Sequence, residues 1–252
     1  MKEPVFVAFS TQKGGAGKTT LTVLTASYLY YVRGLKVLVV DCDYPQYSIK
    51  EMRDRDVEIL RLNATFKKNF IEQRERMQMD PYPILISKPE EALGKVRSVI
   101  ESGEEFDLVL FDLPGTINNP GVAKTVSLMD YIFCPVAADK LILESSLAFA
   151  MKIHEWRTTG YSQVKEMYML WNLVDAREKT DLYDRYEEVF EEQMLQTLET
   201  RLPDAKKYRR EGSKNASRAV FRSTLLPPDR NLLKGSRLVE LVDEILGIIN
   251  PQ

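Results

Sequence analysis

The feature that most constrains this chain is a glycine-rich stretch, residues 13–20, with the sequence Lys-Gly-Gly-Ala-Gly-Lys-Thr-Thr. It follows an apolar run typical of a strand, Val5–Phe9, and leads into a run typical of a helix, Thr19–Tyr31. Glycines let backbone N–H groups curl around an anion without Cβ clashes, and a helix that starts there directs its positive dipole end at the same anion. A strand, a glycine loop, Lys-Thr and a helix in this order predict a phosphate-binding loop.

The residues of this loop have separate expected roles. Lys18 places a point charge on the β- and γ-phosphates, and the Thr19 hydroxyl ligates Mg²⁺. Gln12 stands where the common G-x-x-x-x-G-K-[ST] pattern has its first glycine, and Lys13 follows it. A second lysine on this rim indicates a further phosphate contact, and the alternative is a solvated surface lysine. The predicted nucleotide-binding residues of the loop are Lys13, Gly14, Gly15, Ala16, Gly17, Lys18, Thr19 and Thr20.

Apolar strand-like runs alternate with helical patterns along the 252 residues. Near-continuous apolar strands separated by helices are typical of a mainly parallel, twisted sheet with helices on both faces, the α/β fold of P-loop NTPases. We expect one domain over residues 1–252, and a solvated helical face in the charged stretch 50–79. The predicted strands are Val5–Phe9, Lys36–Val40, Pro83–Ile86, Leu108–Phe111, Tyr131–Pro135 and Met167–Asn172.

Carboxylates follow two of these strands. Asp41 and Asp43 come after the second strand, and Asp112 ends the fourth. Carboxyl ends of parallel strands meet at one edge of a sheet, where carboxylates hold Mg²⁺ or orient an attacking water. We therefore expect Asp112 to bind Mg²⁺ through water, as in a Walker B element. The alternative for the first two is a capping pair after a strand.

The stretch of residues 13–20 resembles the deviant Walker A motif of the ParA/MinD class of P-loop ATPases. The resemblance implies that two subunits sandwich two ATP molecules and that Lys13 contacts the nucleotide of the partner subunit. It also implies that Asp43 is the hydrolytic residue, so the expected catalytic residues are Lys13, Lys18 and Asp43. The usual motif of the family at this position is Asp-x-Asp-Pro-Gln, and this chain differs from it because Tyr44 is inserted before Pro45 and Gln46.

Three further positions are assigned by the same resemblance. Asn172 reads the adenine edge through its amide, unless it forms only an Asx turn. Gly115 stands where the switch region of the family has its second proline, which predicts a more mobile loop. Leu226–Asp229 forms another wall of the base pocket.

A basic segment occupies residues 201–237, where 11 Lys and Arg face 3 Asp and Glu, a net charge of +8 against −10 for the rest. Such an uneven distribution of charge along the chain indicates an anion-binding face, and in ParA-like proteins this region binds DNA without sequence preference. The alternative is a solvated basic loop. The predicted DNA-binding residues are Lys206, Lys207, Arg209, Arg210, Lys214, Arg218 and Arg222.

Other sequence features weigh against competing functions. No apolar run approaches 18 residues, which predicts a cytoplasmic protein without a membrane span. The amphipathic stretch Ser236–Ile249 has an acidic polar face, whereas helices that bind membranes want a basic one, and this disfavours a MinD-like positioning role. A redox enzyme such as the nitrogenase iron protein needs two interface cysteines, and the spacing of Cys42 and Cys134 does not fit.

The sequence thus predicts a short ParA-like ATPase that uses ATP and Mg²⁺ and forms an ATP-dependent homodimer. We expect it to bind double-stranded DNA, and to hydrolyse ATP weakly until DNA and a ParB-like or other small protein stimulate it. The expected task is partition of a plasmid or chromosome, or maintenance of a conjugative element.

Overall fold

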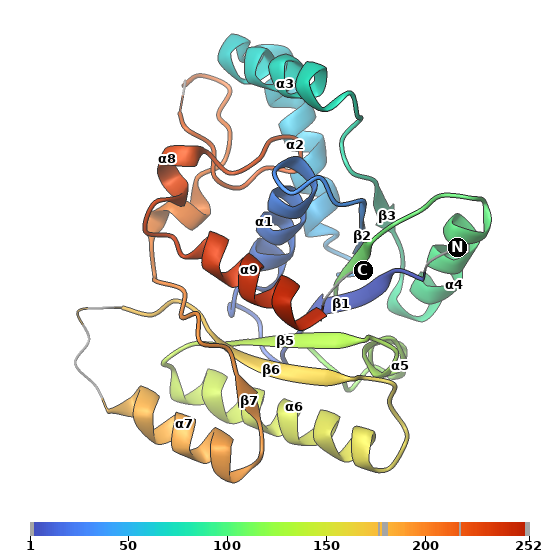
Figure 1. The fold of residues 1–252 in the computed structure, drawn as a ribbon, viewed down its shortest axis with the longest axis vertical. Coiled ribbons are helices and arrows are strands. Elements are labelled where there is room, and N and C mark those ends of the chain that lie inside the picture. The colour runs from blue at the N-terminus through green and yellow to red at the C-terminus, as the bar shows by residue number, and fades with distance from the viewer. Residues whose placement is uncertain (1–2, 176, 178–180, 217, 250–252) are drawn as a thin grey trace.

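The computed structural model, which describes residues 3–175, 177, 181–216 and 218–249, contains one seven-stranded sheet (Figure 1). Neighbouring strands run parallel in the order β3-β2-β4-β1-β5-β6-β7. The predicted parallel sheet is therefore confirmed. The strands are β1 (Val5–Phe9), β2 (Val37–Asp41), β3 (Ile84–Ile86), β4 (Leu108–Asp112), β5 (Tyr131–Val136), β6 (Glu166–Trp171) and β7 (Gln196–Thr197).

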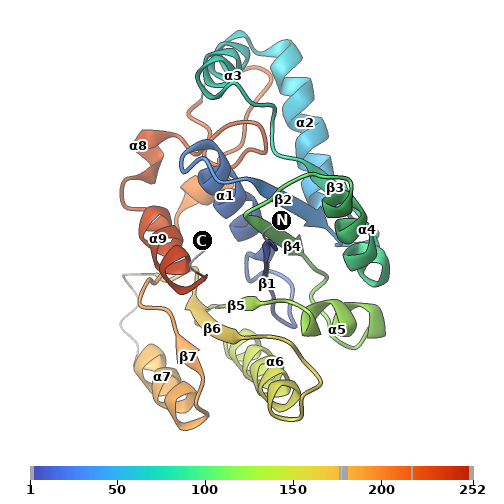
Figure 2. The same cartoon turned by 45° about the vertical axis from the view of Figure 1, so that its right-hand side comes forward.

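Helices cover both faces of this sheet, as predicted (Figures 1 and 2). Residues of α1, α2 and α9 share one apolar core with one side of the sheet, and residues of α4, α5, α6 and α7 share a second core with the other. The helices are α1 (Lys18–Tyr31), α2 (Ser48–Leu62), α3 (Ala64–Met77), α4 (Pro89–Glu101), α5 (Pro120–Ser127), α6 (Lys140–Thr158), α7 (Leu182–Glu192), α8 (Arg230–Leu233) and α9 (Leu238–Ile249), with a 3₁₀ turn, η1, at Lys206–Arg209.

The side chains of β4 alternate between the two faces of the sheet, and this alternation decides to which face its last residue, Asp112, points. Leu108 and Leu110 belong to the core under α1, whereas Val109 and Phe111 belong to the opposite core. Successive side chains of a strand point to opposite faces. Asp112 therefore continues the α1 side and lies beside the start of that helix.

The charged stretch after β2 forms two helices, α2 and α3, separated at Asn63, whose side chain accepts a hydrogen bond from the Phe66 N–H at 2.9 Å. α3 lies at the top of the molecule in both views (Figures 1 and 2). Its Phe66 packs with Ile59 of α2 against Val220 and neighbouring apolar residues of the carboxy-terminal segment. The stretch is thus not only a solvated face.

The last helix, α9, lies beside α1 rather than standing free (Figures 1 and 2). Its buried residues are Leu238, Leu241, Val242, Ile245 and Ile249, at the spacing of one helix face. Within the described residues, no helix combines the length and apolarity that crossing a bilayer requires.

Candidate nucleotide site

A cleft of about 500 Å³ opens where β1, β2 and β4 end. It gathers residues from the glycine loop, from the segment after β2 and from the segment after β4, as expected for a ligand site at the carboxyl edge of a parallel sheet. The lining residues are Gly14, Gly15, Gly17, Lys18, Thr19, Thr20, Asp43, Gln46, Leu113 and Gly115.

The glycine loop has the backbone that its sequence predicts. Gly15 and Gly17 have φ angles of 85° and 92°, which lie in the left-handed region that favours glycine. A Cβ added at Gly17 would lie 2.6 Å from the Asn172 Nδ2 atom, so any other residue there would push this amide aside as well as strain the backbone. α1 then begins directly at Lys18.

The Lys18 side chain lines the cleft. Its Nζ donates to the Lys13 backbone carbonyl at 2.9 Å. Burial lowers the pKa of this amine, while Asp112 and Asp43 oppose that shift. A partly desolvated cation held by a neutral carbonyl is ready to exchange that partner for a phosphate oxygen.

Gly115 lies against this lysine. A Cβ at Gly115 would lie 2.9 Å from Lys18 Nζ and 3.2 Å from the Lys13 carbonyl oxygen. The glycine that replaces a family proline therefore lets the loop after β4 approach the phosphate loop. The sequence showed the replacement, but only the fold shows this close approach.

Asp112 is fully buried at the end of β4. Burial, with Asp41 and Asp43 adding to it, raises its pKa to about 7, while Thr19 and Lys18 act in the opposite direction. Neither carboxylate oxygen has a hydrogen-bond partner of standard geometry among the described residues. A buried carboxylate without partners, beside the Thr19 hydroxyl, has the oxygen donors that Mg²⁺ prefers, so these two residues fit the predicted metal site.

The two aspartates at and just after the end of β2 have different surroundings. Asp41 Oδ2 accepts from the N–H groups of Ile49 and Lys50 at 3.0 and 2.9 Å, and so caps the start of α2. Asp43 is half-buried and lines the cleft, and burial raises its pKa while Lys18 partly offsets that rise. The capping alternative thus describes Asp41, whereas Asp43 faces the ligand. Gln46 lines the cleft too, despite the inserted Tyr44, which is itself exposed.

Lys13 and Asn172 lie at the border of the cleft. The Lys13 side chain is exposed, and it is not among the lining residues. Asn172 is buried at the end of β6, and its amide donates to the Ala16 carbonyl at 2.8 Å. Its contact in the structure is therefore with the phosphate loop, and the predicted contact with adenine stays a prediction.

All seven predicted DNA-binding residues lie on η1 and the loop that follows, and six of them are at or near the surface. Lys206, Arg209, Arg210 and Arg218 are exposed. Lys207 donates to the Lys234 carbonyl. Lys214 is exposed and pairs with Glu58 at 2.6 Å.

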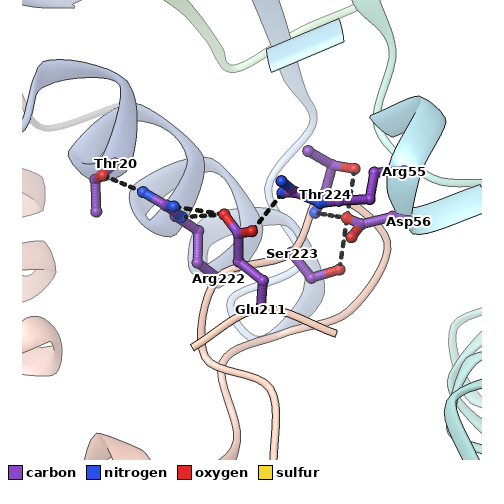
Figure 3. Close-up of polar contacts among 7 residues, drawn as sticks. All are labelled: Thr20, Arg55, Asp56, Glu211, Arg222, Ser223 and Thr224. Carbon is purple, nitrogen blue, oxygen red and sulfur yellow. Dashed lines mark hydrogen bonds and ion pairs between the residues drawn. The ribbon is translucent and has the colours of Figure 1, made fainter. Parts of the chain in front are cut away.

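Arg222 differs from the other six. Its side chain is 20% exposed and forms an ion pair with Glu211, whose side chain is 19% exposed. It also donates to the Thr20 hydroxyl of α1 (Figure 3). Its charge is therefore committed inside the molecule, and we withdraw it from the predicted DNA-binding set. A count of charges along the chain could not detect this, because Glu211 and Thr20 become its neighbours only in the fold.

The segment Leu226–Asp229, predicted to form another wall of the base pocket, is not among the residues that line the nucleotide cleft, and that role stays a prediction. The segment lines a separate cleft of about 420 Å³ against α3, with Asn69, Gln73 and Arg76. Leu225 and Leu226 pack on Ile59 and Phe66, which places the segment against the two charged helices.

Cys42 and Cys134 are both fully buried. Burial raises the pKa of each thiol, to about 12 for Cys134. A buried, protonated thiol is a poorer metal ligand than an exposed thiolate, which weighs against the redox alternative.

Known proteins share this fold and this motif. Residues 7–217 match the family described as CobQ/CobB/MinD/ParA nucleotide binding domain. The chromosome-partitioning ATPase Soj of Thermus thermophilus is 27% identical over 178 residues, covering 68% of this chain and 70% of Soj.

Two solved structures resemble the whole chain. One is described as a plasmid partition protein of Borrelia burgdorferi bound to AMPPNP, with a TM-score of 0.58, 16% identity and coverage of 96% of this chain and 98% of that one. The other is the MinD cell division protein of Aquifex aeolicus, with a TM-score of 0.60, 17% identity and coverage of 97% of each chain. With the family match over most of the sequence, the chain belongs to the CobQ/CobB/MinD/ParA family of nucleotide-binding domains.

Proposed function

We propose that this chain is a single-domain partition ATPase that binds ATP and Mg²⁺, dimerises around the nucleotide and hydrolyses it. The supporting facts are the cleft that gathers Lys18, Thr19 and Asp43, the buried Asp112 beside it, whose oxygens have no hydrogen-bond partner of standard geometry among the described residues, and the likeness to Soj and to a plasmid partition protein. When bound, Mg²⁺ neutralises phosphate charge. Thr19 and Asp112 would hold it, and Asp43 would orient the attacking water.

The observation that carries the dimer is the contrast between the two lysines of the loop. Lys18 lies within its own cleft, whereas the Lys13 side chain is exposed at the rim. An exposed cation beside an anion site can reach the nucleotide of a second subunit. In this proposal Lys13 completes the partner's site, so neither site is complete in the monomer.

The proposed cargo is DNA. The exposed Lys206, Arg209, Arg210 and Arg218 suit phosphate contacts, which need charge density and no base reading. ATP-bound dimers bind the DNA of the nucleoid through two such surfaces. DNA and a small ParB-like protein stimulate ATP hydrolysis, which releases the dimers from the DNA. The cargo is a plasmid, a chromosome region or a conjugative element.

Sedimentation of two lysine variants with ATP and Mg²⁺ tests this function. Lys18→Ala loses a direct charge-assisted phosphate contact, so we expect it not to bind nucleotide. Lys13→Ala is expected to bind nucleotide as a monomer but to form no dimer and to hydrolyse no ATP. A Lys13→Ala protein that dimerises with ATP like the wild type would falsify the cross-subunit role.

A further inference from the structure

The Arg222 side chain connects the carboxy-terminal segment to the helix that begins at the nucleotide cleft. Its Nη1 donates to the Thr20 hydroxyl oxygen at 2.5 Å, and its Nε donates to Glu211 Oε1 at 2.9 Å (Figure 3). Thr20 also lines the cleft. One threonine therefore meets both the ligand space and an arginine from a segment 202 residues away.

The direction of this hydrogen bond leaves the hydroxyl hydrogen of Thr20 unused. A hydroxyl has one hydrogen to donate and two lone pairs that accept, whereas a guanidinium can only donate. Thr20 must therefore be the acceptor. Among the described residues its hydroxyl makes no other hydrogen bond that would consume its hydrogen. Hydrogen bonds in a chain polarise one another, so a cationic donor on the oxygen makes this hydroxyl a stronger donor.

Glu211 keeps the arginine where it is. Its Oε1 accepts from Arg222, and its Oε2 pairs with Arg55 of α2 at 2.8 Å (Figure 3). The Arg222 and Glu211 side chains are 20% and 19% exposed, so solvent screens the pair only in part. A neutralised guanidinium is drawn less strongly into the cleft itself. Arg222 thus acts through Thr20 and not as a direct phosphate ligand.

The backbone that follows Arg222 is fixed to the same helix. Ser27 Oγ donates to the Ser223 carbonyl at 2.7 Å, and the Tyr31 hydroxyl donates to the Thr224 carbonyl at 2.8 Å. Positions 20, 27 and 31 are spaced seven and four apart and so share one face of α1. The arginine and the threonine that it contacts are therefore held in one frame.

We propose that Arg222 is a positioning residue of the nucleotide site, which holds the Thr20 hydroxyl so that its hydrogen is donated to a phosphate oxygen of a nucleoside di- or triphosphate. This inference rests on the nucleotide binding proposed above. The Arg222 N–H donates to the Arg210 carbonyl at 2.9 Å, so the same residue joins the phosphate site to the basic loop.

A double-mutant cycle on the full chain tests this role, with Mg²⁺-ADP as the probe and calorimetry as the measurement. Arg222→Gln is expected to weaken binding roughly tenfold, the size of one hydrogen bond that involves a charged group. Thr20→Val removes the hydroxyl and is expected to weaken it by a similar factor. In the T20V background, R222Q is expected to weaken binding less than about twofold further, because its effect passes through the missing hydroxyl.

Arg230→Gln is the matched control, since it removes an exposed arginine of the same segment and is expected to leave Mg²⁺-ADP binding unchanged. Thermal unfolding without nucleotide checks that each variant is folded. If R222Q does not fold, Arg222→Lys replaces it in the same cycle, with a smaller loss expected in the wild-type background and none in T20V. Equal losses in the two backgrounds would overturn the positioning role. A wild-type protein that binds no Mg²⁺-ADP would instead overturn the proposed function.

Discussion

At the scale of single residues, burial shifts the pKa of one side chain in the cleft, Lys18, and of one beside it, Asp112. Burial lowers the pKa of Lys18 and raises that of Asp112 to about 7. A phosphate beside Lys18 and a cation beside Asp112 would each favour the charged form. Binding of a nucleotide and a cation there would therefore oppose both shifts.

Asp112→Asn tests the cation half of this site. The amide cannot replace a carboxylate that holds Mg²⁺ through water, and loss of such a partner costs roughly 10- to 100-fold in metal affinity. We expect wild-type ADP binding to strengthen when Mg²⁺ is added, and D112N to bind ADP equally with Mg²⁺ and with EDTA. Calorimetric titration in both buffers is the measurement. A D112N protein that keeps the full Mg²⁺ response would place the metal elsewhere.

Asp43→Ala separates hydrolysis from binding. Asp43 lines the cleft and has no contact with α2 of the kind that Asp41 makes, so its loss should spare the fold. We expect ATP turnover to fall by at least about 100-fold while ATP binding and the dimer persist. Phosphate release and sedimentation with ATP measure the two properties. Loss of ATP binding in this variant would show that Asp43 serves the nucleotide or the metal instead.

At the scale of secondary-structure elements, the sequence pattern predicted the features that depend on neighbouring residues in the chain. The sequence predicted the ends of the six strands longer than two residues to within one or two residues. Apolar runs and the spacing of apolar residues in helices can be read directly from the sequence. The strand β7, Gln196–Thr197, was missed because two residues are too few to show the alternating pattern of a strand. The loop glycines and Asp43 were recognised from their motif.

Contacts between distant elements were the part that the sequence could not supply. The sequence left Asp41 open between a carboxylate at the ligand edge and a cap, and only the fold shows that it accepts from the Ile49 and Lys50 N–H groups of α2. The contacts of Leu225 and Leu226 with Ile59 and Phe66 were not foreseen, and Arg222 was counted as a surface charge. In each case the deciding partner lies on another element, and a single sequence does not show which charges or apolar residues will meet.

The buried Asp56 of α2 is the main anchor of Ser223 and Thr224. Its Oδ2 accepts from the Ser223 hydroxyl at 2.9 Å and from the Thr224 N–H and hydroxyl at 2.7 and 2.9 Å (Figure 3). Asp56→Ala leaves these donors unpaired, so we expect it to lower the free energy of unfolding by roughly 3 kcal/mol. Asp56→Asn keeps an acceptor oxygen and should cost less. Urea denaturation measures both.

The same residue gives a pH dependence. Burial raises the pKa of Asp56 above its ordinary value of 3.8, so the folded state holds the proton more tightly than the unfolded state does. The stability contributed by this proton is present below pH 3.8 and is lost as the pH rises towards the higher folded pKa. Relative to D56N, wild type should therefore lose stability across this window. A constant difference between the two proteins at every pH would contradict it.

At the scale of the whole molecule, charge is divided between the basic segment and the remainder of the chain. Residues 201–237 carry +8 and the rest carries −10. One monomer offers only a few phosphate contacts, whereas a dimer offers two linked sets whose effects multiply. DNA binding should therefore depend on ATP and ignore sequence. The logarithm of the DNA-binding constant should fall linearly with the logarithm of the salt concentration, with a slope of about −0.9 per neutralised phosphate.

Salt titrations with random duplex DNA test this in the presence of ATP, of ADP and of no nucleotide. Charge reversal at Arg209 and Arg210, or at Lys206 and Arg218, is expected to abolish binding while ATP binding persists. The matched control reverses Lys140 and Lys152 of α6, which covers the opposite face of the sheet. Equal binding in all three nucleotide states, or no loss in either reversal, would leave the segment a solvated surface.

The central position of β1 has a consequence for synthesis on the ribosome. This strand lies between β4 and β5, and the Phe6 N–H donates to the Asp130 carboxylate, 124 residues further along. At 5–20 residues per second, the nascent chain needs roughly 6–25 s to extend from one to the other. The phosphate loop is thus translated long before the strands that support it exist, so a nucleotide can bind there only late in the life of the nascent chain.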